Sequence, residues 1–145
     1  MAEPSDFKIV VALNKDLEAG IVLNTASHLC LGLMRRVEIE YPENVALFDF
    51  QKYCTGDGIE LPYISARSLI VLRAKNGELR RLLQEIRILG APHVSFIETM
   101  TQGDYRDQLV RTSQAQFQNI PIFGVACLAQ KAAVDPLTRR LSLWR

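Results

Sequence analysis

Four short runs of apolar residues constrain the fold of this chain more than any other sequence feature. The runs cover residues 7–13 (FKIVVAL), 68–74 (SLIVLRA), 93–97 (HVSFI) and 122–129 (IFGVACLA). A strand buried on both faces is apolar along its length and rich in β-branched residues, whereas a strand with one face in water alternates apolar and polar residues. The four runs therefore predict four strands of one sheet whose two faces are both covered.

Two segments with a helical period supply that cover. The first is expected to run from Leu17 to about Arg35, with Asp16 as its N-cap. Its apolar stripe is expected to comprise Val22, Leu23, Ala26, Leu29, Cys30, Leu33 and Met34, and its polar side Asn24, Thr25, Ser27, His28 and Arg35. The second is expected over residues 77–89, capped by Asn76 and ended by Gly90.

The order of these elements predicts an α/β fold. The strand–helix–strand succession from 68 to 97 is a βαβ unit, whose strands are parallel and whose crossover is right-handed. A chain of 145 residues corresponds to one domain. We therefore expect a single domain over residues 1–145, with residues 1–6 as a flexible tail, built on one sheet of about four strands with helices on both faces.

The segment between residues 45 and 64 combines a turn signal with several large apolar residues. Residues 45–53 are consistent with an irregular strand, residues 55–58 (TGDG) with a tight turn, and residues 59–64 with the returning strand, which Pro62 confines to an edge. A small domain does not bury every apolar side chain of such a segment. We expect Leu47, Phe48 and Phe50 to contribute to an exposed patch, and the protein to form a homodimer.

Composition removes several classes of function. The 17 basic and 16 acidic residues give a net charge of +1, so a nucleic-acid partner is not expected, although a local basic patch stays open. The three cysteines lack a C-x-x-C spacing and there are only two histidines, so we expect no metal site and no cofactor. No run approaches the ~20 apolar residues of a membrane span, and no signal peptide opens the chain, which predicts a cytoplasmic protein without a membrane partner.

Candidate functional residues gather where the expected strands end. Ligands of such sheets bind beyond the carboxyl ends of the strands, which points to residues 14–16 and 98–104 and to the helix that begins beside them. The candidates are Asp16, Asn24, Thr25, Ser27, His28, Glu98, Thr99 and Thr101. His28 or Glu98 is the candidate catalytic base. The alternatives are structural: a helix cap for Asp16, a backbone-bonded imidazole for His28 and an arginine partner for Glu98.

Parts of the sequence also resemble a known family. The opening KIVVALNKDLEAGIVLNTASHLCLGL, the middle segment GDGIELPYISARSLIVLRAKNGELRRL, the later IETMTQG and the final GVACLAQKAAVDPLTRRLSLW are similar to the domain-of-unknown-function 2000 family. The resemblance implies a fold related to the type II peptidyl-tRNA hydrolases, with a compact, single-layer mixed sheet. Asp16-Leu17 matches those hydrolases, but residues 21–23 (IVL) stand where they have lysines. Cleavage of peptidyl-tRNA is therefore not expected.

Three functions remain open from the sequence. The first is a binding module that holds a small polar ligand in the cleft at the strand ends. The second is a hydrolase of a small ester or amide that uses His28 or Glu98 as base. The third is a structural homo-oligomer whose surface is the functional part. The first two are favoured together, and the residues do not decide between them.

Overall fold

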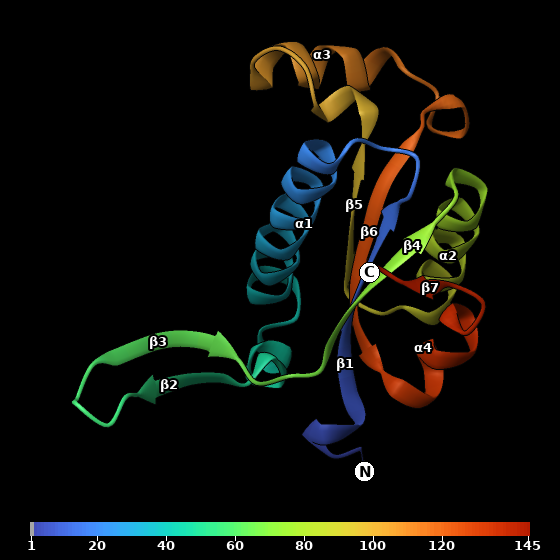
Figure 1. Cartoon of the computed structure of the whole chain (residues 1–145). Helices are drawn as coiled ribbons and strands as arrows, with labels where there is room; N and C mark the ends of the chain where they lie inside the picture. Colours follow the sequence, from blue (N-terminus) through green and yellow to red (C-terminus); the bar gives the residue numbers. More distant parts are fainter. Residues whose placement is uncertain (1) are drawn as a thin grey trace.

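The computed structural model describes residues 2–145 and has three layers, with helices on both sides of a mixed sheet (Figure 1). The sheet has five strands in the order β5-β6-β1-β4-β7. Their bounds are β1 (Phe7–Asn14), β4 (Leu69–Ala74), β5 (His93–Ile97), β6 (Ile122–Gln130) and β7 (Ser142–Leu143). Helix α1 (Ala19–Glu40) covers one face, and α2 (Asn76–Leu89) and α4 (Lys131–Thr138) cover the other.

All four apolar runs lie in this one sheet, as predicted. The strand count is five rather than four, because residues 142–143 add β7 along the outer edge of β4. Strand β1 is parallel to β4 and antiparallel to β6, and β6 is antiparallel to β5. The two strands of the βαβ unit, β4 and β5, therefore run in the same direction, with β1 and β6 between them. The sheet is mixed, as the resemblance implied.

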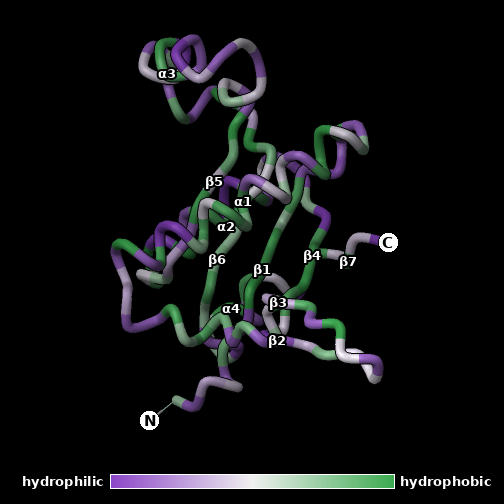
Figure 2. The backbone as a smooth tube through the Cα atoms, turned by 90° about the vertical axis from the view of Figure 1, so that its left-hand side faces the viewer, coloured by the Kyte–Doolittle hydropathy of each residue, from purple (hydrophilic) through white to green (hydrophobic). Residues whose placement is uncertain are grey.

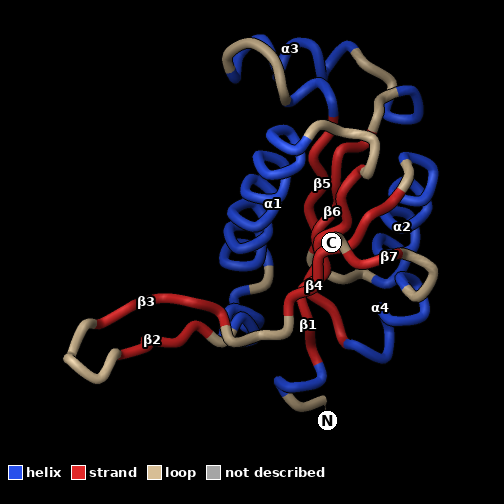
Figure 3. Tube along the Cα trace, in the orientation of Figure 1, coloured by secondary structure: helices blue, strands red, loops and turns tan. Residues whose placement is uncertain are grey.

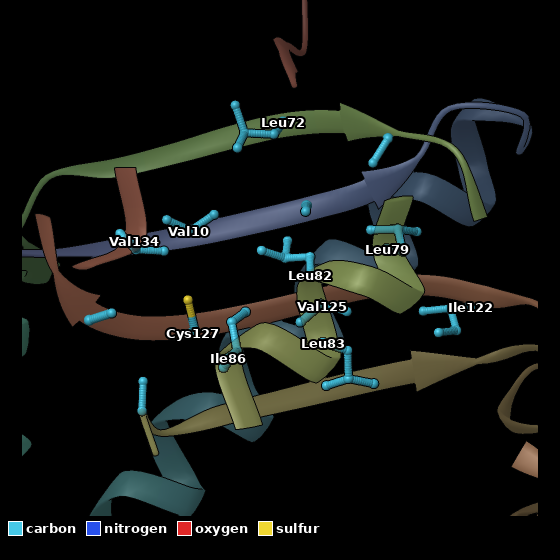
Figure 4. Close-up of a cluster of buried hydrophobic side chains, with 14 of the residues drawn as sticks. Val10, Leu72, Leu79, Leu82, Leu83, Ile86, Ile122, Val125, Cys127 and Val134 are labelled. Atoms are coloured by element: carbon cyan, nitrogen blue, oxygen red, sulfur yellow. The ribbon is translucent and has the colours of Figure 1, made fainter. Parts of the chain in front are cut away.

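Both faces of the central strands are buried, which explains their continuous apolar runs. In β1, Val10 and Ala12 face α2 and α4, whereas Ile9, Val11 and Leu13 face α1. Figure 4 shows the cluster on the α2 side, where side chains of α2 such as Leu83 and Ile86 pack on β1 and β6. The predicted end of α2 is confirmed: Gly90 adopts a left-handed conformation with φ of 73° and closes the helix.

Helix α1 differs from its prediction in both position and rotation. It begins at Ala19 after Glu18 and runs to Glu40, so Asp16 is not its N-cap. Its buried face is Val22, Thr25, Leu29, Leu33 and Val37, whereas Leu23 and Cys30 are exposed. The reason lies in β6, where Gly124 has no side chain and lets the small Thr25 approach the sheet closely.

Asn76 also differs from its predicted role as a cap. The cap position belongs to Lys75, and Asn76 is the first helical residue. Its side-chain oxygen accepts a hydrogen bond of 2.7 Å from the backbone N–H of Ile122. Asn76 thus ties the start of α2 to the start of β6, a contact between residues that lie far apart in the sequence.

The segment from 50 to 65 leaves the body of the protein as a projecting hairpin, preceded by residues that pack beneath α1 (Figure 3). Residues 42–48 form a 3-10 helix, η2 (Pro42–Phe48), where the sequence suggested the start of a strand. The hairpin strands are β2 (Phe50–Cys54) and β3 (Glu60–Ser65), joined at the predicted turn, and they form a separate two-stranded sheet. The strand of this hairpin begins only at Phe50, because Asp49 turns the chain with φ of 52°.

The remaining elements are short. They are η1 (Pro4–Asp6), which lies in the segment expected to be a tail, η3 (Glu98–Met100), α3 (Tyr105–Gln114) and η4 (Phe117–Asn119). Helix α3 lies beyond the carboxyl ends of the strands, above the start of α1 in Figure 1. Within residues 2–145, no helix has the length and apolar character that crossing a membrane requires.

Candidate functional site

The carboxyl ends of β1 and β4 form a topological switch point. The two strands are parallel neighbours. The chain leaves β1 toward α1 on one face of the sheet and leaves β4 toward α2 on the other face (Figure 1). Because the two connections diverge, a crevice opens between them, and open α/β sheets bind their ligands in such crevices.

A basic pocket of about 200 Å³ lies at this switch point. Lys15 follows β1, Arg73 lies in β4, Lys75 follows β4 and Arg140 precedes β7. Glu78 is the only carboxylate among the lining residues. The pocket is lined by Lys15, Arg73, Lys75, Glu78, Arg140, Leu141 and Ser142. It therefore combines four cationic side chains with one anionic side chain.

The cations of the basic pocket lack ionic partners in the part of the chain that the structure describes. The ion pairs found there involve other residues, such as Arg35 with Glu38 and Arg36 with Glu40. The Glu78 carboxylate accepts a hydrogen bond of 2.7 Å from the backbone N–H of Lys75. Its charge is thus already engaged at the start of α2, and the pocket keeps an excess of positive charge.

The amino end of α2 adds to this positive potential. Lys75 occupies the cap position and makes no side-chain cap hydrogen bond. The first backbone N–H groups of a helix have no partner within the helix, and its amino end carries a partial positive charge. Lys75 and Glu78 both line the basic pocket, so α2 begins at its wall. The open space beside Gly77 leaves this end of the helix accessible.

The residues that the sequence predicted as a site on α1 do not form a cluster like that of the basic pocket. The exposed ring of His28 stacks on Phe96 of β5, with ring centroids 5.4 Å apart and an interplanar angle of 8°. Asn24 and Ser27 are exposed, and the Ser27 hydroxyl donates to the Leu23 carbonyl at 2.8 Å. Thr25 is fully buried against the sheet, and its hydroxyl has no hydrogen-bond partner. Thr25 therefore cannot contact a ligand in a cleft.

The other predicted residues make local contacts. The Thr101 hydroxyl donates to the Glu98 carbonyl at 2.6 Å, and the Thr99 and Thr112 hydroxyls are 2.7 Å apart, which fastens η3 to α3. Asp16 is exposed, and its backbone N–H donates to the Asn14 side chain. Among residues 2–145, no hydrogen bond or ion pair joins His28 to Glu98 or Asp16.

Outside this region, the pKa values of His93, Cys127 and Cys30 are shifted by burial. His93 Nδ1 lies 2.8 Å from the Ala91 carbonyl oxygen, and burial lowers the pKa of His93. Burial raises the pKa of the Cys127 thiol to about 12 and also raises the pKa of Cys30. The described residues contain no group of three or more His, Cys, Asp or Glu side chains that could hold a metal ion.

The sequence interpretation missed the basic pocket because its cations are far apart in the chain. Lys15, Arg73 and Arg140 come from three separate segments, and no run of basic residues in the sequence indicates that they meet. One signal was available. The rule that points beyond the carboxyl end of the first run applies equally to the second, and Arg73 and Lys75 lie there.

Comparisons with known proteins agree with this fold. A solved structure, that of the protein of unknown function Atu0240 from Agrobacterium tumefaciens strain C58, is similar with a TM-score of 0.78. It is 22% identical in sequence, and the similarity covers 97% of this chain and 98% of that chain. A comparison with curated protein sequences gives no match. The model of a protein family of unknown function, DUF2000, matches residues 7–145. The chain therefore belongs to the DUF2000 family.

Proposed function

We propose that this protein binds a small, phosphate-bearing ligand in the basic pocket at the carboxyl ends of β1 and β4. The observation that carries the proposal is the convergence of Lys15, Arg73, Lys75 and Arg140 on one hollow at the switch point of the sheet. This refines the sequence-based expectation of a small polar ligand at the strand ends. It moves the site from the His28 face of α1 to the β4 side of the same sheet edge.

Charge favours a phosphate over a neutral polar ligand. Hydrogen bonds between ionised partners are about twice as strong as neutral ones, and an arginine can engage two phosphate oxygens at once. The amino end of α2 contributes further donors of the kind that bind phosphate in many proteins. A neutral ligand would leave the cations of the pocket uncompensated. Leu141 offers an apolar contact for the part of the ligand that carries the phosphate.

The size of the basic pocket favours a small molecule over a nucleic acid. The four cations line a single hollow of about 200 Å³. A nucleic acid binds through phosphates spread along its backbone, and its affinity depends on many separate contacts. The overall charge of +1 supplies no wider attraction for such a polyanion.

Calorimetric titration with inorganic phosphate, pyrophosphate and simple phosphomonoesters tests the proposal. We expect binding that Lys75→Gln and Arg140→Gln each weaken by at least ~10-fold, since a hydrogen bond to a charged group contributes about 1.5–3 kcal/mol. Arg106→Gln on α3 is the matched control, because Arg106 is exposed and does not line the pocket. Binding to none of these compounds, or equal loss in the control, contradicts the proposal. Binding to an oligonucleotide alone would assign the basic pocket to nucleic acid instead.

The hydrolase alternative rests on the stacking of His28 on Phe96. The stack holds the imidazole in one plane while His28 stays exposed, and a general base must be accessible to its substrate. Release of product from a panel of small esters and amides, abolished by His28→Ala, supports it. Absence of turnover across the panel argues against it.

A further inference from the structure

The hairpin of residues 50–65, termed the arm below, lacks a packing partner within its own chain beyond its base, where Phe50 stacks on Phe48. Every residue of β2 is exposed, and so is every residue of β3 except Ser65. The arm extends away from the sheet and from α1, so neither of its faces rests on the body (Figures 1 and 3). A two-stranded hairpin alone in water is marginally stable at best. The arm therefore needs a surface that this single chain does not supply.

The composition of the arm is that of an interface and not of a solvated loop. Its exposed large apolar side chains are Phe50, Tyr53, Ile59, Leu61, Tyr63 and Ile64. Tyr63 is 65% exposed. Figure 2 shows apolar stretches of the arm that alternate with polar ones. Tyrosine and phenylalanine are enriched at the centres of protein interfaces. The two charged side chains of the strands, Lys52 and Glu60, pair with each other at 3.7 Å, so burial of the arm leaves no unpaired charge on them.

An apolar groove of about 260 Å³ lies at the base of the arm. Helix α1 packs on β5, β6 and β1, and it leaves Leu69 of β4 45% exposed on the same face. The groove runs between that edge of the sheet and the helix. Leu31 on its rim is 72% exposed. The groove is lined by Ile9, Cys30, Leu31, Leu33, Met34, Phe48, Phe50, Ser65 and Leu69.

We infer that the arm of one copy lies along this groove of a second copy, in a two-fold homodimer. Arm and groove are apolar and adjacent on the same chain, so a two-fold axis places each arm on the groove of its partner and closes the assembly at two copies. A fully exposed aromatic side chain offers ~200 Å² of surface to a partner. Because the apolar side chains of the arm are partly exposed, together they offer on the order of 600 Å². The groove adds to this area, so each copy approaches the ~800 Å² per partner of a stable interface.

This inference is independent of the proposed ligand. The groove involves the carboxyl half of α1 and the start of β1, whereas the basic pocket lies at the carboxyl ends of β1 and β4. The sequence predicted a homodimer, and the inference assigns the arm and the groove as its interface. Of the residues expected there, Phe50 is exposed on the arm, whereas Phe48 is buried in the core of its own chain.

Mass measurement by light scattering at high micromolar concentration tests the inference. We expect the full chain to have the mass of two copies. Leu61→Asp with Tyr63→Asp on the arm, and separately Leu31→Asp on the groove rim, should each raise the dissociation constant of the dimer at least ~10-fold. The matched control is Ile88→Asp on α2, since Ile88 is 87% exposed and lies outside arm and groove. The control should remain a dimer.

A mixing experiment separates the arm from the groove. The arm variant keeps an intact groove and the Leu31→Asp variant keeps an intact arm, so an equimolar mixture should regain one of the two contacts and form a heterodimer. Circular dichroism of each variant establishes that it is folded, which the exposure of the substituted residues favours. A monomeric full chain overturns the inference, and so does a dimer that the arm and groove variants leave intact. A monomer would assign the arm to a different protein partner.

Discussion

The guanidinium group of Arg73 lies over the ring of Trp144, with 5.5 Å between its central carbon and the ring centroid. Arg73 is opposite Ser142 in the β4–β7 ladder, and the Trp144 backbone N–H donates to the Val71 carbonyl at 2.9 Å. The last residues of the chain are thus fastened beside β4. Through Arg73, the only tryptophan of the protein is coupled to the basic pocket.

This contact makes Trp144 a reporter of ligand binding. A phosphate that engages Arg73 draws charge from the ring face and changes tryptophan emission, since the cation–π contact depends on the position of that charge. We expect a saturable change in emission on titration with phosphate compounds. Arg73→Gln should abolish the change and weaken binding. An emission change of full size in Arg73→Gln would contradict this coupling.

Gly124 is expected to be intolerant of a side chain. A Cβ at this position would lie 2.7 Å from Leu29 Cδ1 and 3.0 Å from both Leu13 Cδ2 and Thr25 Cγ2. Gly124→Ala should therefore lower the free energy of unfolding by about 1–3 kcal/mol, because α1 must shift away from the sheet. Urea denaturation measures the change. Gly20→Ala is the control: it lies in α1 with nothing within 4 Å and should be neutral or stabilising.

The close contact at Gly124 also explains why the sequence predicted the strands but not the rotation of α1. The continuous apolar runs suffice to place β1, β4, β5 and β6, although burial on both faces, which the sequence predicted for all four, holds only for β1 and β6. The face that a helix buries depends on what lies opposite, and the glycine opposite Thr25 is 99 residues away in the chain. The cations of the basic pocket were missed for the same reason. They meet only through the pairing of β1 with β4 and of β4 with β7.

Thr25 offers a second test of the same interface. Its hydroxyl is fully buried and has no hydrogen-bond partner, so the fold bears the cost of removing it from water. Thr25→Val keeps the shape and removes that cost, and it should raise the free energy of unfolding by about 1–2 kcal/mol. Thr138→Val is the matched control for the free energy of unfolding. The buried Thr138 hydroxyl donates to the Val134 carbonyl, so its removal should bring no such gain. Destabilisation by Thr25→Val would indicate that the hydroxyl has a partner after all.

The half-buried His93 predicts a pH dependence of stability. Burial lowers its pKa from 6.5, and the charge of Arg36 lowers it as well, against the raising effect of the Ala91 carbonyl. A base with a depressed pKa in the folded state takes up its proton first in the unfolded chain. Its contribution is therefore complete above pH 6.5 and is lost as the pH falls below that value. Urea denaturation between pH 8 and pH 5 should show this decline, and His93→Gln should reduce it. An equal decline in the variant would place its cause elsewhere.

We expect that the protein does not cleave peptidyl-tRNA. Such a reaction needs a positive or hydrogen-bonding group to stabilise the developing oxyanion. Ile21 and Leu23 are exposed at the start of α1, and they supply no charge. The positive charge of Lys15, which precedes α1, lies in the lining of the basic pocket. Incubation with peptidyl-tRNA should release no free tRNA above the uncatalysed rate. Release that His28→Ala or Glu98→Ala abolishes would instead establish α1 and η3 as a catalytic site.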